Sequence, residues 1–247
     1  MTARTRRLAP AALALVLLAG CGGDGESSGG SAEAEPSTVT VTETASPEAA
    51  DGPAQQELTE KQIEAALPTE KEAPDGFEED SNVRTGAKST RSTDPDRCRA
   101  VYLDTDEFRS WSKGHSSASG AVRYTEPGDA AGRPSVSVFV TSYDTPIPKK
   151  FFDRAGSALG ACRGFTEKVS SSSSWVDKKA SSISAPVVGD QTFAQRVGLV
   201  DMDLTIDQLY VRSGHNLINV RVLTGYSEYS DETLGELAEG VLEDLEG

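Results

Sequence analysis

The stretch LTIDQLYVRSGHNLINVRVLT, residues 204–224, decides the fold. Two runs within it, Leu204–Arg212 and Asn216–Thr224, alternate between apolar and polar side chains, which is the period of a half-buried β-strand. Ser213-Gly214-His215 lies between them and predicts a tight turn. We therefore expect an antiparallel hairpin whose inward-facing side chains are Leu209, Val211, Leu217, Val220 and Val222.

The same alternation recurs upstream and predicts a second hairpin. Ala118–Thr125 is one strand, and its partner places Val136, Val138 and Val140 on one face and Phe139 on the other. Apolar residues at helical spacing predict helices over 58–67, 149–162 and 230–245, the last capped by Ser230. Hairpins with flanking helices make an α+β fold, here an antiparallel sheet built of hairpins.

The first twenty residues have the pattern of an export signal. Arg4, Arg6 and Arg7 are followed by the uncharged segment Leu8–Gly20, rich in Ala and Leu. As a helix, that segment would span about 20 Å, which is less than the roughly 30 Å hydrocarbon core of a bilayer. We interpret residues 1–20 as a signal peptide.

The signal ends in Leu18-Ala19-Gly20-Cys21, which resembles the bacterial lipobox. In that motif the Cys thiol accepts diacylglycerol, and cleavage before the Cys makes it the new, acylated N-terminus. Two or more acyl chains anchor a protein stably, whereas one chain binds only marginally. We expect a palmitate-type lipid on Cys21 and attachment to the extracytoplasmic face of the cell membrane; an ordinary signal peptide with a chance cysteine is the alternative.

A linker is predicted between this anchor and the folded body. Residues 22–57 contain eight acidic residues, no Lys or Arg and no aromatic residue. High net charge with little apolar surface to bury is typical of disorder. Every aromatic residue lies between Phe77 and Tyr229, so we assign residues 21–57 to a lipidated, disordered acidic linker and 58–247 to a single α+β domain.

Two cysteines remain beyond Cys21. In an exported protein an even pair is most simply a disulfide, so Cys98 and Cys162 are expected to be joined. The bond would connect a short helix over 97–103 with the end of the 149–162 helix. Two free buried thiols are the alternative.

Charge and composition exclude several functions. The formal net charge is −15, so we expect no nucleic-acid partner, because phosphate contacts require clustered Lys and Arg. His115 and His215 lie in Gly/Ser-rich turns and are expected to be solvated. Asp201, Asp203 and Asp207 lack the spacing of a calcium loop and are expected to lie on a solvated strand edge. Gly25–Gly29 matches a nucleophile elbow only within the predicted linker. We expect no catalytic residues, metal or cofactor.

One resemblance covers most of the body. Cys98 with Tyr102, then Phe151-Phe152 and Cys162, then Val211–Val220 and an acidic C-terminal helix occur in an order that resembles the extracellular sensor domain of the PknH family of actinobacterial kinases. The resemblance implies an antiparallel sheet with packed helices, disulfides, and a cleft proposed to bind an unidentified ligand. That domain has more than one disulfide, whereas this chain can form one beyond Cys21.

We therefore expect a monomeric, non-enzymatic module that binds or senses a small molecule or an envelope-protein ligand whose binding residues are unknown. Between residues 81 and 226 basic residues outnumber acidic ones, which favours an anionic ligand. Aromatic residues such as Trp111, Tyr124, Trp175 or Tyr210 are candidates for the mouth of its site. The alternatives are a structural or assembly partner of another envelope protein, and an envelope hydrolase.

Overall fold

The structure of the protein, a computed structural model, describes residues 42–43, 52–83, 90–128, 133–170, 173–200, 204–224 and 231–246. By its internal contacts the chain divides into Met1–Glu35 and Pro36–Gly247, and all described residues belong to the second unit. The predicted signal peptide, Cys21, Asp201, Asp203 and the Ser230 cap lie outside the described residues. No described helix is both long enough and apolar enough to cross a bilayer.

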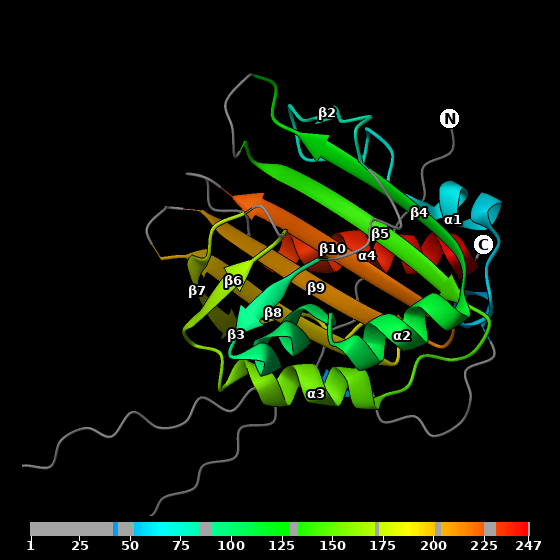
Figure 1. The fold of residues 1–247 in the computed structure, drawn as a ribbon. Coiled ribbons are helices and arrows are strands. Elements are labelled where there is room, and N and C mark those ends of the chain that lie inside the picture. Colours follow the sequence, from blue (N-terminus) through cyan, green and yellow to red (C-terminus); the bar gives the residue numbers. More distant parts are fainter. Residues whose placement is uncertain are drawn as a thin grey trace, which may run out of the picture. The chain divides into compact units, whose positions relative to one another are not determined.

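One sheet organises the body, and every strand pair in it is antiparallel. Its order is β2-β4-β5-β10-β9-β8-β7-β6-β3, with β1 paired to β8 (Figure 1). The strands are β1 (Thr42–Glu43), β2 (Glu78–Glu79), β3 (Ser92–Asp94), β4 (Ser116–Thr125), β5 (Ser135–Tyr143), β6 (Phe165–Lys168), β7 (Val176–Ser182), β8 (Gln191–Leu199), β9 (Thr205–Ser213) and β10 (Asn216–Thr224).

The predicted hairpin lies at the centre of this sheet. β10 pairs with β9 on one side and with β5 on the other, and Gly214 makes the turn with a φ of +52°. Ile218, Val220 and Val222 point to one face and are buried. The prediction that Leu217 faces the same core as Val220 and Val222 was wrong. Leu217 is an odd number of residues from them along the strand, so its side chain points to the other face and packs against the core there.

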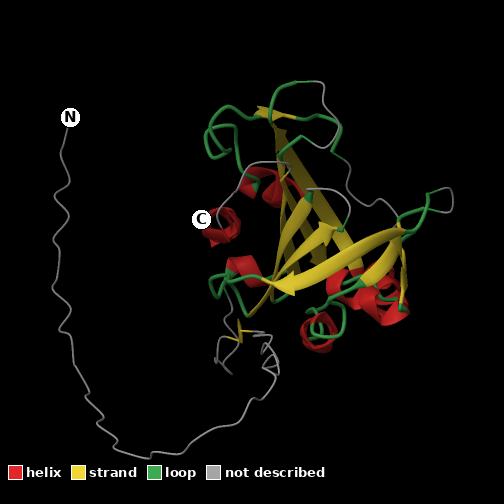
Figure 2. Ribbon diagram, turned by 90° about the vertical axis from the view of Figure 1, so that its left-hand side faces the viewer, coloured by secondary structure: helices red, strands yellow, loops and turns green. Residues whose placement is uncertain are grey.

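Helices cover both faces of the sheet (Figure 2). On the first face, α1 (Glu60–Ala66) and α4 (Asp231–Glu246) bury Ile63, Leu234 and Val241 against the valines of β5 and β10. A capping box between Thr59 and Gln62 begins α1. Gly120 of β4 allows α1 to approach closely, because a Cβ there would lie 2.5 Å from Ile63 Cγ2. The α+β prediction is confirmed.

The second face carries the aromatic core. The 3-10 helix η2 (Asp96–Tyr102), α2 (Asp106–His115) and α3 (Lys150–Leu159) pack there around Phe152, Phe193 and Tyr210. A disulfide joins Cys98 of η2 to Cys162, with the two Cα atoms 5.7 Å apart. Cys162 lies three residues beyond the end of α3, so the predicted helix over 149–162 is shorter than expected.

The body begins earlier than the sequence indicated. Gly52–Glu57, assigned to the linker, forms the 3-10 helix η1 (Pro53–Gln55) and packs on the β9–β10 turn. Asn216 Nδ2 donates to the carbonyl oxygens of Ala54 (2.9 Å) and Gln56 (2.8 Å), and the backbone N–H of His215 donates to that of Gln55. Backbone carbonyls make these contacts, so composition alone gave no signal for them.

We predict that removing the disulfide destabilises the body without changing its fold. The Cys98→Ala/Cys162→Ala variant should lose about 4 kcal/mol of unfolding free energy, because a cross-link of this span restricts the unfolded chain. Urea denaturation of the oxidised protein, the reduced protein and the variant measures this. Equal midpoints for all three would contradict the prediction.

Candidate ligand-binding site

Part of the second sheet face is not covered by a helix. On the side of Figure 1 that faces the viewer, no helix crosses the middle of β4, β5 and β10. There the side chains are half-buried, except for that of Ser137, which is buried, while their neighbours in sequence are buried in the first core. We call this area the open face; its residues are Arg123 of β4, Ser137 and Phe139 of β5, and Asn219, Arg221 and Leu223 of β10.

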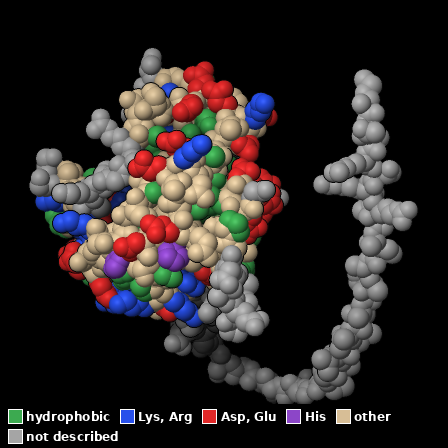
Figure 3. Space-filling view, turned by 90° about the vertical axis from the view of Figure 1, so that its right-hand side faces the viewer, with side chains coloured by type: hydrophobic (Ala, Val, Ile, Leu, Met, Phe, Trp, Pro, Cys, Tyr) green, Lys and Arg blue, Asp and Glu red, His purple; other side chains and the backbone are tan. Residues whose placement is uncertain are grey.

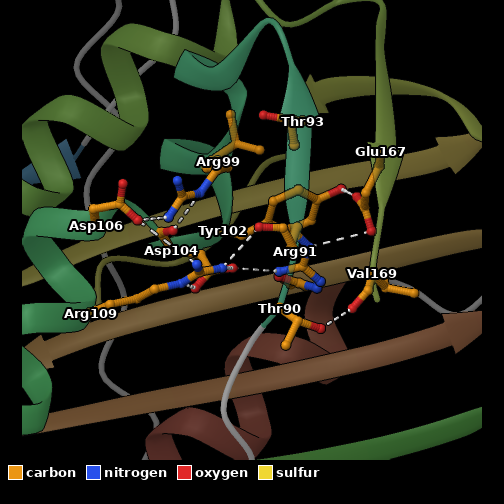
Figure 4. Close-up of polar contacts among 12 residues, drawn as sticks. Thr90, Arg91, Thr93, Arg99, Tyr102, Asp104, Asp106, Arg109, Glu167 and Val169 are labelled. Atoms are coloured by element: carbon orange, nitrogen blue, oxygen red, sulfur yellow. Dashed lines mark hydrogen bonds and ion pairs between the residues drawn. The ribbon is translucent and has the colours of Figure 1, made fainter. Parts of the chain in front are cut away.

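Beside the open face lies a network of charges held by η2, α2 and β6 (Figure 4). The Arg91 guanidinium carbon lies 3.8 Å from the centre of the Tyr102 ring, and Arg91 Nε lies 3.3 Å from Glu167 Oε1. The Tyr102 hydroxyl donates a hydrogen bond to Glu167. Burial, followed by the charge of Glu167, raises the pKa of Tyr102 well above its ordinary value, so this phenol stays protonated.

The same network joins η2 to α2. Arg109 binds Asp104 through two contacts, Nε to Oδ1 at 2.6 Å and Nη2 to Oδ2 at 2.8 Å. Arg99 Nη2 lies 2.5 Å from Asp106 Oδ1, and its Nη1 lies 3.2 Å from Asp96. Each of these arginines therefore has a carboxylate partner, and we interpret the network as a rigid wall rather than as the binding group.

Two cations facing this area differ from the others. Arg221 of β10 is half-buried and Lys178 of β7 is 8% exposed. Among the residues the structure describes, neither side chain forms a hydrogen bond or an ion pair. By contrast, Arg196 is bound to Asp207 at 2.7 and 2.6 Å.

The pKa values of both side chains are lowered, which means that their charged forms are disfavoured where they lie. Burial lowers the pKa of Arg221, and the charges of Arg91 and Arg123 lower it further, against the opposing effect of Tyr210. Burial also lowers the pKa of Lys178, which Glu167 opposes and Arg91 and Arg221 reinforce. A partly desolvated cluster with excess positive charge is stabilised by an anion.

Only one of the four candidate aromatics borders this area. Tyr210 lies on β9, where its hydroxyl donates to Gln208 on the same face, and burial raises its pKa to about 12. Trp111 packs with Phe108, Tyr143 and Phe151. Tyr124 is buried in the first core and donates to the Pro68 carbonyl oxygen, and Trp175 is 50% exposed beside Lys168.

The histidines are more constrained than expected. His115 ends α2 rather than lying in a turn, and its Nδ1 is 2.7 Å from Asp144 Oδ1. His215 Nδ1 is 2.8 Å from the Tyr143 carbonyl oxygen, and Figure 3 shows the two histidines on the same side of the surface. No described Ser, Thr or Cys is hydrogen-bonded to either ring.

One of the acidic residues expected to be solvated, Asp207, has a partner. Asp207 is buried in the Arg196 pair, so it is not a solvated strand edge. Within the described ranges, no group of three His, Cys, Asp or Glu side chains is placed to hold a metal ion.

Two hollows occur away from the open face. One, of about 440 Å³, lies between the segment 66–74 and α4, and Glu72, Glu236 and Asp244 line it. The other, of about 570 Å³, lies beside the sheet edge at Tyr124 and includes Glu64, Glu70 and Glu79. Their acidic lining disfavours an anion, so the open face is the better candidate.

Comparison with known proteins shows what the fold is similar to. The extracellular domain of PknH from Mycobacterium tuberculosis superposes with a TM-score of 0.58 at 13% identity, over 77% of this chain and 98% of that one. The two share a fold. An uncharacterized Mycobacterium smegmatis protein, an Rv0999 ortholog, matches with a TM-score of 0.40 at 8% identity, over 78% and 100% of the two chains. No family model and no curated protein matches the chain.

We predict that Arg221 does not stabilise the fold. Arg221→Met should leave the free energy of unfolding unchanged or raise it, because the variant removes an unpaired, partly desolvated charge. Arg196→Met is the matched control on the neighbouring strands, and it should cost about 2 kcal/mol by stripping the buried Asp207 of its partner. Equal losses in urea denaturation would show that Arg221 has a structural role.

Proposed function

We propose that this protein is a non-enzymatic binding or sensing module, and that its open face holds a small anionic ligand. The observation that carries the proposal is that Arg221 has no carboxylate partner among the described residues, whereas the other described sheet arginines, Arg123, Arg196 and Arg212, lie near Asp80, Asp207 and Asp190. A protein that keeps an unpaired, partly buried cation gives up stability, and binding of an anion would recover it.

The geometry also disfavours hydrolysis. A hydrolase needs a nucleophile beside a base, or two carboxylates free to exchange protons. The His115–Asp144 pair has no hydroxyl or thiol partner among the described residues, and arginines already hold Asp104 and Glu167. A binding role requires neither feature.

We further propose that the module is displayed on the extracytoplasmic side of the membrane by a lipid on Cys21. The signal pattern and lipobox support this, as does the disulfide, since such bonds persist in oxidising compartments. The PknH domain that shares the fold is itself extracellular.

A second candidate function is docking to another envelope protein. Val169 (54% exposed), Trp175, Val176 and Val200 are exposed apolar residues at one end of β6, β7 and β8. The backbone N–H of Val200 donates to the Asp177 carbonyl oxygen, so this residue lies beside the start of β7. An exposed apolar patch of this kind is typical of an interaction surface.

Lipidation is tested directly by metabolic labelling with a fatty acid. The wild-type chain should carry label, and Cys21→Ser should carry none and remain unprocessed at this position, because the thiol is the acylated atom. Label on the serine variant would refute the anchor.

The binding role is tested by native mass spectrometry of the protein isolated from its own envelope. The wild type should retain a small anionic molecule, and Arg221→Gln should lose it. Arg154→Gln is the matched control, because Arg154 lies exposed on α3 beside Glu107 and should leave the ligand bound. A copurifying protein in place of the small molecule would favour the docking function.

A further inference from the structure

We propose that the outer edge of β4 binds an extended, basic peptide segment of a partner protein, which adds to the sheet as a further antiparallel strand. The segment carries Lys or Arg at every second position. This surface is distinct from the anion site around Arg221, so either site can exist without the other.

Most of the outer edge of β4 has no neighbouring strand among the described residues. β2 pairs only with the last two residues of β4 (Figure 1). The Arg123 carbonyl oxygen points to this edge, because it accepts from the backbone N–H of Asp80 at 2.8 Å. Residues two apart on a strand direct their backbone groups to the same side, so the N–H and C=O groups of Ser119 and Ala121 also face outward. Within the described ranges these four groups have no partner.

The edge also lacks the usual features that prevent strand addition. Exposed edges are commonly protected by devices such as lysine, proline or a bulge. β4 has a bulge only between Ser116 and Ala118, and the whole strand Ser116–Thr125 contains no Lys or Pro. Beyond the bulge, Ser119 and Ala121 are small and leave room for a neighbouring strand. Such an edge can supply affinity through main-chain hydrogen bonds.

The hollow of about 570 Å³ adjoins this edge on the side of the first core. Val122 and Tyr124 of β4, with Leu67 just after α1, form its apolar part. Side chains of an added strand alternate between the two faces, so every second one would enter the hollow, while the others lie beside Ser119 and Ala121. The aliphatic part of a Lys or Arg side chain fits such a surface while its charged end stays at the rim.

The rim of the hollow is acidic. Glu64, Glu70 and Glu79 line it together with one lysine, Lys71. These three carboxylates are exposed, and in the part of the chain that the structure describes none of them forms an ion pair. Burial, followed by the charges of neighbouring glutamates that include Glu79 and Glu70, raises the pKa of Tyr124 to about 12. The negative potential therefore extends from the rim to the sheet.

Charge selects among the occupants that could fill the edge. A second copy of this chain, pairing through its own β4, would bring two sets of these glutamates together, and opposed like charges are destabilising. The predicted linker, residues 22–57, has eight acidic residues and no Lys or Arg, so it is disfavoured for the same reason. On the opposite face, Arg123 disfavours a basic side chain beside it. A segment that alternates basic with small neutral residues matches both faces.

The test is fluorescence anisotropy of the labelled peptide TKTKTKT with the full chain carrying Cys21→Ser and an oxidised Cys98–Cys162 bond. In the antiparallel arrangement the threonines lie opposite Ser119 and Ala121 and exchange hydrogen bonds with them, while the lysine N–H groups point away. N-methylation of the threonines should therefore weaken binding about tenfold. N-methylation of the lysines is the matched control and should leave the affinity unchanged.

A proline on the edge tests the same hydrogen bonds from the protein side. Ala121→Pro should weaken the peptide about tenfold and preserve the sheet, because proline is tolerated on an edge strand where its nitrogen faces outward. Ala121→Ser keeps the N–H and is the matched control. Arg221→Gln should leave the affinity unchanged, which separates this edge from the anion site.

The charge of the hollow is tested by a pair of glutamate variants. E70Q/E79Q should weaken TKTKTKT about fivefold, because two carboxylates at the rim are lost. E239Q/E243Q changes the net charge equally on the exposed side of α4, outside the hollow, and should have a much smaller effect.

Four results would overturn the proposal. One is the absence of TKTKTKT binding, and another is equal affinity for the threonine-methylated and lysine-methylated peptides. A third is equal binding of the acidic peptide TETETET. The last is self-association of the full chain in sedimentation velocity that Ala121→Pro abolishes, since the edge would then be an interface between two copies.

Discussion

The register of β10 between β5 and β9 is the constraint on which the rest of the structure depends. Because successive side chains point to opposite faces, this register commits Ile218, Val220 and Val222 to the first core and Asn219, Arg221 and Leu223 to the open face. A slip of one residue would bury Arg221 among valines and expose three large apolar side chains. The stability of the core and the chemistry of the other face are therefore set by the same hydrogen bonds.

Charge is distributed unevenly over this frame. Around η2 and α2, arginines and carboxylates meet at close distances, and the disulfide fixes η2 near the end of α3. In this network the positive charges of the arginines are largely compensated by the carboxylates. Arg221 and Lys178 lie near this network without a carboxylate bound to either side chain among the described residues, and the neighbouring arginines help to lower the pKa of both.

The sequence predicted what depends on local pattern. Alternation located the β9–β10 hairpin, helical spacing located α3 and α4, and an even cysteine pair identified the Cys98–Cys162 bond. The open face could not be predicted, because Arg91, Lys178 and Arg221 come together only through strand order. Leu217 shows the limit within one strand: an apolar residue on a strand buried on both sides does not reveal which core it joins.

The attachment of Gly52–Glu57 to the β9–β10 turn has a mechanical consequence. Gly52–Glu57 is bound at one end of the sheet, where Asn216 and His215 donate hydrogen bonds to its carbonyl oxygens. Arg221 lies toward the other end of the sheet, several residues farther along β10. A force applied to the chain ahead of Gly52 is therefore transmitted to the β9–β10 turn and to the adjoining start of β8, where β1 pairs, rather than to the opposite end of the sheet.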